Sequence, residues 1–267
     1  MDRTTCVRDG VHKRTPGANV GQRCAERKVY GAGVTDVIAH RGAARAAREN
    51  SVEAFRLAVN RGADAIELDV RPTADGVLVV HHDAHLADGR AIVATTRSEL
   101  PAAVADLGPA LDACRDVVVN IELKNDPSDP DYDIEDLLAD AVVELVAGRK
   151  EPRTRWLISS FRLATVDRVR QLAPDLATAF LTVTADLDDV ARCRDHGHAT
   201  WHPWVGLVTA ESITAAHEAG LRVNTWTCND REQAVRLAGW GVDGIVTDVP
   251  DEIRSALAAR AAGARPA

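Results

Sequence analysis

The stretch GADAIELDV, residues 62–70, carries the pattern on which the prediction of the fold depends. From Ile66 to Val70 apolar and acidic residues alternate, which is typical of a β-strand with two chemically different faces. A segment with helical spacing, residues 51–59, precedes this strand, and the same alternation of strand and helix returns along the chain. We expect strands at 37–39, 65–70, 117–123, 156–159, 178–182, 200–204, 221–225 and 244–247.

Helical segments between these strands predict parallel pairing. They include residues 51–59, 134–146, 163–172, 187–196, 212–219 and 231–240. Eight such units favour the α/β class and a (β/α)8 TIM barrel over an open doubly wound sheet, because no G-x-G-x-x-G turn follows the first strand. The turn Asp75-Gly76 before residues 77–80 predicts a small hairpin strand, an insertion after the second strand of the barrel.

Length and composition indicate one globular domain. The chain has 267 residues, of which 46% are hydrophobic and 27% are charged. We expect residues 1–35 to form a mobile tail, residues 36–260 to form the barrel and residues 261–267 to form a C-terminal tail. The oligomeric state is left open.

Net charge, apolar runs and cysteine spacing indicate which binding partners and which cellular location to expect. A net charge of -8 argues against general attraction to nucleic acid or to an anionic membrane surface. No apolar run approaches the roughly 18 residues of a membrane-spanning helix, so no stable membrane insertion is expected. The five cysteines show no C-x-x-C spacing, which predicts reduced thiols and, with the lack of an apolar signal region, a cytoplasmic location.

Three carboxylates are expected at the carboxyl ends of neighbouring strands, where a barrel of this class opens. Glu67 and Asp69 are two residues apart and therefore point to the same side of their strand, as Glu122 and Lys124 do on the next barrel strand. Like charges in a partly dry site are costly unless a cation relieves them. Any one of these acids could instead form an ion pair, but the three together predict a site for Mg²⁺ or Ca²⁺.

Histidines follow two of the predicted strands. His40 ends the first strand, and His81-His82-Asp83 follows the small hairpin strand. Because imidazole titrates near neutral pH, two histidines at one rim beside carboxylates predict an acid/base pair. The residues alone leave open which of His81 and His82 faces the site, although Asp83 could orient the ring of His82.

Lys124 is the only one of four lysines that is expected at an inward strand end. A compact ammonium there could hold a phosphate oxygen, or it could pair with Glu122 or Asp69 for stability.

The run Glu49-Asn50-Ser51 precedes the first helix. Asn50, with Glu53 three residues later, predicts a helix N-cap with a capping-box partner. Glu49 is then left on the loop above the barrel mouth, where it could orient Arg41 or a ligand hydroxyl.

The ordered motifs of the chain resemble those of the glycerophosphodiester phosphodiesterases over roughly residues 36–258. The motifs are VIAHRG at 37–42, ENS at 49–51, EAF at 53–55, GADAIELDV at 62–70, DGVLVVHHDAHL at 75–86, IELK at 121–124, SSF at 159–161, VNTWT at 223–227 and GIVTDVP at 244–250. The chain departs from the usual family pattern at Arg48, Ser51, 87–90 and 108–111, which bears on substrate preference.

The resemblance implies a metal-dependent phosphodiesterase that hydrolyses small-molecule glycerophosphodiesters to glycerol 3-phosphate and an alcohol. It selects His82 over His81, because the family motif is His-Asp. It also implies metal ligands at Glu67, Asp69 and Glu122, acid/base histidines at His40 and His82, phosphate contacts from Arg41 and Lys124, and a pocket wall at Trp226.

Three other interpretations differ in what they require of the sequence. A lysophospholipase D-like activity on single-chain phospholipids would need an apolar groove at the mouth, for which Trp201 and Trp204 are candidates, although both could be core residues. A catalytically idle barrel would bind a metal or a glycerophosphate ligand without turnover. An enolase-type proton abstraction would need metal carboxylates on three successive strands, so two acids on one strand do not fit it.

Overall fold

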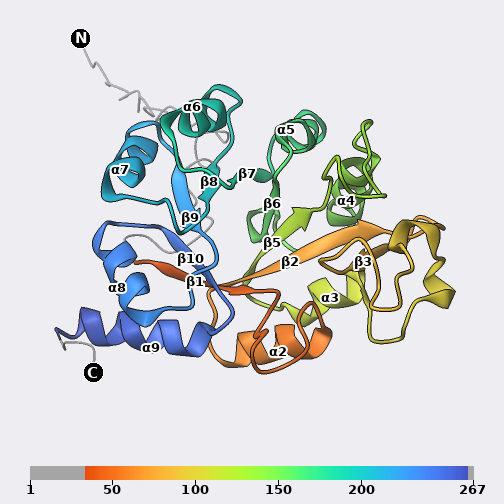
Figure 1. Ribbon diagram of the computed structural model, residues 1–267, viewed down its shortest axis with the longest axis horizontal. Helices are drawn as coiled ribbons and strands as arrows, with labels where there is room; N and C mark the ends of the chain where they lie inside the picture. The colour runs from red at the N-terminus through yellow and green to blue at the C-terminus, as the bar shows by residue number, and fades with distance from the viewer. Residues whose placement is uncertain (1–33, 264–267) are drawn as a thin grey trace, which may run out of the picture.

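A computed structural model describes residues 34–263 and shows a closed parallel β-barrel with helices on its outside (Figure 1). Each barrel strand pairs with the next one along the chain, and β1 pairs with both β2 and β10, which closes the ring. The barrel strands are β1 (Asp36–His40), β2 (Ala65–Pro72), β5 (Val118–Leu123), β6 (Trp156–Ser160), β7 (Ala177–Thr182), β8 (Thr200–Pro203), β9 (Arg222–Thr225) and β10 (Gly244–Thr247). The predicted (β/α)8 TIM barrel is confirmed.

The insertion after β2 is larger than the hairpin strand that the sequence indicates. Strand β3 (Leu78–Val80) pairs antiparallel with β2, and the two-residue strand β4 (Ala105–Asp106) pairs antiparallel with β3. Between them lie two short 3₁₀ turns, Ile92–Ala94 and Arg97–Glu99. The insertion has a small apolar core of its own, which contains Val79, Ile92 and Leu100.

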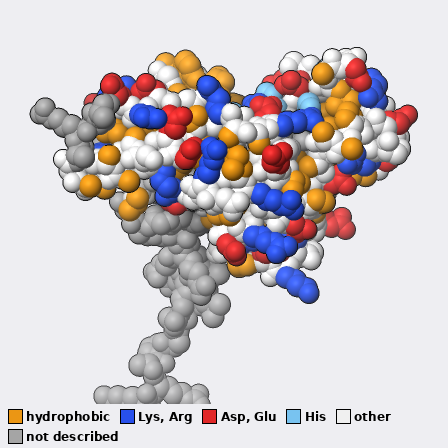
Figure 2. All heavy atoms as spheres, turned by 90° about the horizontal axis from the view of Figure 1, so that it is seen from below, with side chains coloured by type: hydrophobic (Ala, Val, Ile, Leu, Met, Phe, Trp, Pro, Cys, Tyr) orange, Lys and Arg blue, Asp and Glu red, His pale blue; other side chains and the backbone are white. Residues whose placement is uncertain are grey.

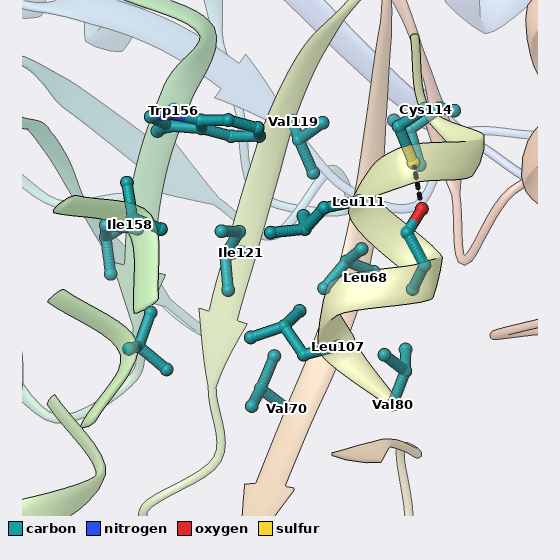
Figure 3. Packing of buried hydrophobic residues seen from close by; sticks show 14 of the residues in the cluster. Leu68, Val70, Val80, Leu107, Leu111, Cys114, Val119, Ile121, Trp156 and Ile158 are labelled. Carbon is teal, nitrogen blue, oxygen red and sulfur yellow. Dashed lines mark hydrogen bonds between the residues drawn. The ribbon is translucent and has the colours of Figure 1, made fainter. Parts of the chain in front are cut away.

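Helices cover the outer face of the barrel (Figure 1). They are α2 (Val52–Asn60), α3 (Leu107–Ala113), α4 (Leu137–Ala147), α5 (Leu163–Leu172), α6 (Leu187–Asp195), α7 (Ala210–Glu218), α8 (Arg231–Gly239) and α9 (Pro250–Ala261). Figure 3 shows how the core forms, with Leu107 and Leu111 of α3 beside Leu68 of β2 and Ile121 of β5. The apolar residues that alternate with the acids therefore face the helices, and the acids face the barrel interior.

Two helices that the sequence analysis left out lie in this layer. Helix α3 begins with Leu107-Gly108-Pro109, a run that suggests a break, but proline is tolerated in a first helical turn, whose N–H groups have no partner within the helix. Helix α9 begins with Pro250 and is rich in alanine, and it buries only Pro250 and Ile253 strongly, so its apolar periodicity is weak. Helix α4 begins at Leu137 rather than at residue 134.

The predicted tails fall mostly outside the described residues. Of residues 1–35 only Val34 and Thr35 are described, and Thr35 donates a hydrogen bond from its hydroxyl to the carbonyl of Val242. At the other end, α9 continues to Ala261. Across residues 34–263 no helix combines the length and the apolar character needed to cross a membrane.

Candidate active site

Three buried carboxylates meet at the carboxyl end of β2 and β5. Register places Asp69 of β2 directly beside Glu122 of β5, and Glu67 beside His40 of β1. One oxygen from each of Glu67, Asp69 and Glu122 lies within 4.8 Å of the others. The structure therefore brings together the three carboxylates that the sequence analysis selected as metal ligands.

Asp69 is held by three neighbours. Lys124 Nζ lies 2.9 Å from its Oδ1, Asn50 donates a 2.7 Å hydrogen bond to its Oδ2, and Arg41 Nε lies 3.3 Å from the same oxygen. Burial alone would raise the pKa of Asp69, but the charges of Lys124 and Arg41 outweigh burial and hold that pKa below its usual value. Asp69 therefore remains ionised.

Asn50 is not the helix N-cap that we expected. The cap of α2 is Ser51, whose side chain accepts a hydrogen bond from the backbone N–H of Ala54. Asn50 adopts a positive φ of 54° and turns its amide toward β2, where it also accepts from the Asp69 N–H. Asn50 and Ser51 are both residue types that favour the N-cap position. The hydrogen bonds between Asn50 and Asp69 leave Ser51 as the cap.

Lys124 bridges two of the carboxylates. Its Nζ lies 2.5 Å from Glu122 Oε1 as well as 2.9 Å from Asp69 Oδ1. Burial alone would lower the pKa of Lys124, yet the charges of Glu122 and Asp69 raise it. The ion pairs that the sequence analysis gave as one of two roles for Lys124 are present.

Glu67 is the least compensated member of the cluster. Its Oε2 accepts a 3.0 Å hydrogen bond from the Arg41 N–H, but its buried Oε1 has no hydrogen-bond partner among the described residues. Burial first, and then the nearby charge of Asp69, raise the pKa of Glu67 to about 8. A buried carboxylate oxygen without a partner, in an all-oxygen cluster, fits a hard divalent cation.

His40 is oriented by a residue from the opposite end of the chain. Its Nδ1 lies 2.6 Å from Asp248 Oδ1, and Asn229 donates a 2.6 Å hydrogen bond to the other oxygen of Asp248. His40 Nε2 then faces Glu67, 4.0 Å from its Oε2. Burial alone would lower the pKa of His40, but the Asp248 hydrogen bond and the Glu67 charge raise it.

His82 lies in a different electrostatic environment. Its Nδ1 lies 2.7 Å from Asp83 Oδ1, and its backbone carbonyl accepts a 2.8 Å hydrogen bond from Arg71. Burial, and then the positive charge of Lys124, lower the pKa of His82. His82 lines the pocket described below, whereas the ring of His81 bonds back to the carbonyl of Asp83.

Backbone geometry at Arg41 and Gly42 explains the His-Arg-Gly sequence after β1. Both residues have positive φ, 53° and 84°, and a Cβ on Gly42 would lie 2.7 Å from the carbonyl carbon of Ala54. The turn aims the Arg41 side chain at the site, where both oxygens of Glu49 accept from its Nη1 at 3.0 and 3.1 Å. Glu49 itself is half exposed, so it orients Arg41 from the solvent side.

A pocket of about 120 Å³ lies between the two histidines and the charged side chains described above. Trp226, Phe161, Leu181 and His202 form much of its wall and floor, and it holds His40, Arg41, Glu67, His82, Glu122 and Lys124. An adjoining outer cleft of about 510 Å³ shares His82, Glu122, Lys124 and Phe161 with it. The face in Figure 2 shows histidines beside acidic and basic side chains at a notch in the molecular outline.

Comparison with known proteins identifies the family. The model of the glycerophosphoryl diester phosphodiesterase family matches residues 40–252. The chain belongs to the glycerophosphoryl diester phosphodiesterase family. It is therefore a phosphoric diester hydrolase.

Relatives and solved structures agree with this assignment. YhdW of Bacillus subtilis strain 168 is 32% identical over 240 residues, which cover 81% of this chain and 96% of YhdW. A glycerophosphodiester phosphodiesterase of Caldanaerobacter subterraneus subsp. tengcongensis is 30% identical, covering 82% of this chain and 96% of the relative. A phosphodiesterase of Oleispira antarctica, solved with the product sn-glycerol-3-phosphate, superposes with a TM-score of 0.76 at 26% identity and covers 84% of this chain and 97% of its own.

Several residues of this phosphodiesterase site were not selected from the sequence. Asn50 holds Asp69, Asp248 holds His40, and Phe161 and His202 line the pocket. Asp248 and Phe161 lie inside quoted motifs and directly after strands β10 and β6, so their place at strand ends was a usable signal. His202 had no such signal, since it lies within β8 and is fully buried, and burial lowers its pKa to about 3.

Proposed function

We propose that this phosphodiesterase hydrolyses glycerophosphodiesters to sn-glycerol 3-phosphate and an alcohol, in a reaction that depends on Mg²⁺ or Ca²⁺. The pocket that His40, Arg41, His82, Lys124, Glu67 and Glu122 line, with Asp69 beside it in the carboxylate cluster, carries this proposal. Its volume of about 120 Å³ is well below the roughly 300–1,000 Å³ of drug-sized ligand sites, so it suits a small glycerophosphate group. The outer cleft of about 510 Å³ would take the alcohol part.

Charge balance supports a cation together with an anionic substrate. As ligands of a cation, Glu67, Asp69 and Glu122 would bring three negative charges, against the two positive charges of Arg41 and Lys124. A divalent cation held by the three carboxylates would give the site a net positive charge, which complements a phosphodiester with one negative charge. When bound, the cation supplies Lewis-acid stabilisation of charge on the phosphoryl oxygens.

The two histidines would divide the proton transfers. Their environments move the pKa values apart, upward for His40 and downward for His82. Near neutral pH His40 would hold a proton and donate it to the departing alcohol, while neutral His82 would accept one from the attacking hydroxyl. Asp248 and Asp83 fix the Nδ1 atom of each ring, which leaves Nε2 for these transfers. The attacking group would be water, or the 2-hydroxyl of the glycerol moiety, in which case water would open the resulting cyclic phosphate in a second step to give glycerol 3-phosphate.

Arg41 and Lys124 would bind the phosphate group. Arg41 is aimed at the site by the turn after β1 and by Glu49. Lys124 has carboxylate partners on its inner side and lines both the pocket and the outer cleft. Trp226, whose ring meets Phe161 edge-on at 5.2 Å between centroids, would pack against the carbon chain of the glycerol moiety.

A substrate panel tests the proposal. The full chain, with Mg²⁺ or Ca²⁺ added, should release sn-glycerol 3-phosphate from glycerophosphocholine, glycerophosphoethanolamine and glycerophosphoglycerol. Binding of these compounds without release would indicate an idle barrel and would contradict the proposal. Cleavage of other phosphodiesters only would leave the family assignment intact and reject the glycerophosphodiester substrate.

A lysophospholipase D-like activity is the second candidate. Exposed apolar side chains follow β6, β7 and β8, and two of them, Phe161 and Val183, line the outer cleft. Trp204 is exposed on the connection after β8, whereas Trp201 is a core residue. If an acyl chain lies along this cleft, Val183→Ser should slow turnover of lysophosphatidylcholine and leave turnover of glycerophosphocholine unchanged.

A further inference from the structure

Two histidines and an aspartate converge at the end of the barrel remote from the mouth. Asp167 lies on α5, His196 is the C-cap residue of α6, and His198 lies in the connection that leads into β8. Connections from a helix to the next strand lie at the amino-terminal ends of barrel strands, opposite the active site. The cluster is therefore separate from the phosphodiesterase chemistry.

His198 is the unusual member of the cluster. Its side chain is fully buried, its Nδ1 lies 2.9 Å from Thr178 Oγ1, and its Nε2 lies 3.3 Å from Asp167 Oδ1. Among the described residues Nε2 has no hydrogen-bond partner in bonding geometry. Complete burial of the side chain favours the neutral ring, which carries one N–H.

The position of that one N–H decides what Nε2 can do. If Nδ1 donates to Thr178, the lone pair of Nε2 faces a carboxylate oxygen, and two acceptors then oppose each other at a buried position. A cation between them removes this conflict. Metal-binding histidines in proteins show the same arrangement, with one ring nitrogen on the metal and the other N–H held by a nearby oxygen.

The remaining geometry suits a small cation with tetrahedral coordination. His196 Nδ1 lies 2.8 Å from Asp167 Oδ2, and the ligand atoms of the three residues lie within 4.8 Å of one another. Zinc bonds of about 2.0–2.1 Å separate tetrahedral ligands by roughly 3.4 Å, so small side-chain shifts would suffice. His196 is exposed beside a surface hollow of about 470 Å³, which gives an ion access from solvent and room for a water as fourth ligand.

We propose that Asp167, His196 and His198 form a second metal site, which binds Zn²⁺ or a similar transition-metal ion and ties α5 to the connection between α6 and β8. Two imidazoles and one carboxylate favour such an ion over Mg²⁺ or Ca²⁺, which prefer oxygen ligands. Arg170 works against the site, because its guanidinium lies against Gly197 and lines the same hollow. Its charge should weaken the affinity without blocking the three ligand atoms.

Cobalt titration of the full chain tests this site. The protein is stripped with a chelator and then held in excess Mg²⁺, which occupies the all-oxygen site at the mouth. Co²⁺ should then bind with one equivalent that shows the visible absorption of a four-coordinate ion. Zn²⁺ should displace it and raise Tm by about 5 °C at a hundredfold excess over Kd.

Variants separate this site from other ligands in the chain. His198→Gln and the less buried Asp167→Asn should each weaken Co²⁺ binding at least tenfold, and Arg170→Gln should tighten it. His217→Gln is the matched control, since His217 is an exposed histidine paired with an aspartate, 2.8 Å from Asp243 Oδ2. Glu122→Gln should abolish phosphodiesterase activity and leave the cobalt spectrum unchanged. A cobalt spectrum that survives both His198→Gln and Asp167→Asn, or that carries thiolate charge-transfer bands, would overturn the proposal.

Discussion

The two ends of the barrel hold their carboxylates in different ways. At the closed end, Asp64 Oδ2 accepts from the Val37 N–H at 2.8 Å and from Arg254 at 2.6 Å, and Asp36 lies 3.0 Å from Arg222. At the mouth, three carboxylates lie together with Lys124 between two of them, and Glu67 Oε1 has no partner among the described residues. At the closed end one oxygen of Asp64 has two donors, whereas at the mouth three acids lie together and one buried oxygen of Glu67 has no donor among the described residues.

This contrast predicts different responses to neutralising an acid. At the closed end, removal of the Asp64 carboxylate leaves its donors without an acceptor and should lower stability, whereas Asp36 is buried with only partial compensation from Arg222, so neutralising it should raise stability. At the mouth, neutralising an acid removes charge repulsion that Arg41 and Lys124 relieve only in part, and it should lower activity because a metal ligand is lost.

Glu67→Gln should give the largest effect. Loss of a metal-ligating charge should lower kcat/KM by roughly a thousandfold or more, since several kcal/mol of charge stabilisation depend on the cation. In the metal-free protein above pH 8, where Glu67 would be ionised, the same change should raise Tm. Activity assays and thermal melts in chelator measure both. If Glu67→Gln is less stable than the wild type and fully active, then Glu67 behaves like a structural acid of the closed end, and the proposed difference between the two ends is wrong.

His82→Ala should lower kcat by about two to four orders of magnitude, the usual contribution of a positioned acid or base. Metal affinity should stay close to that of the wild type, because His82 is not one of the three carboxylate ligands. His81→Ala is the control and should behave like the wild type, since its ring bonds to the carbonyl of Asp83 outside the pocket. The reverse result would show that His81 serves the reaction.

Asp36→Asn should change how stability depends on pH. Burial, only partly offset by Arg222, raises the pKa of Asp36 to about 7 from 3.8. Between pH 4 and 7 the folded wild type therefore holds a proton that the unfolded chain has lost, so its stability falls as pH rises. The variant lacks this loss and should gain on the order of 4 kcal/mol relative to wild type over that range. Denaturant unfolding at several pH values measures the free energy of unfolding of the variant and of the wild type. A difference between the two that does not change with pH would contradict the raised pKa of Asp36.

Asp64→Ala should give the smallest effect, a loss of about 1 kcal/mol of stability. The Val37 N–H and Arg254 would each lose an acceptor, although Arg254 can turn to solvent. Turnover and KM should not change, because Asp64 lies at the closed end of the barrel. A marked fall in kcat would mean that the two ends are coupled.

Local sequence pattern was enough to predict the barrel and most of the site. Alternation on β2 and β5 placed Glu67, Asp69 and Glu122 on the inner face, and parallel register then made them neighbours. The Lys124 position follows from the same logic, whereas His82 was selected over His81 by the resemblance to the family motif His-Asp. These residues were predictable because strand periodicity is a local property that tertiary packing preserves.

The supporting residues depend on contacts between distant segments. Asp248 reaches His40 only because β1 pairs with β10 when the barrel closes. Asn50 was assigned to the helix cap because local pattern cannot weigh a hydrogen bond to Asp69 on another element. The tail at residues 1–35, the ligand roles and the cytoplasmic location stay predictions.

The central claim is that the acids at the mouth bind a metal ion that the reaction needs. The most direct test is to measure turnover as a function of the concentration of free divalent cation. Chelated protein should release no glycerol 3-phosphate from glycerophosphocholine, and Mg²⁺ or Ca²⁺ should restore release along a saturable curve. Sodium or potassium at the same ionic strength should restore nothing. Full turnover in excess chelator would contradict the account, because Glu67, Asp69 and Glu122 would then serve the reaction without the cation that their arrangement fits.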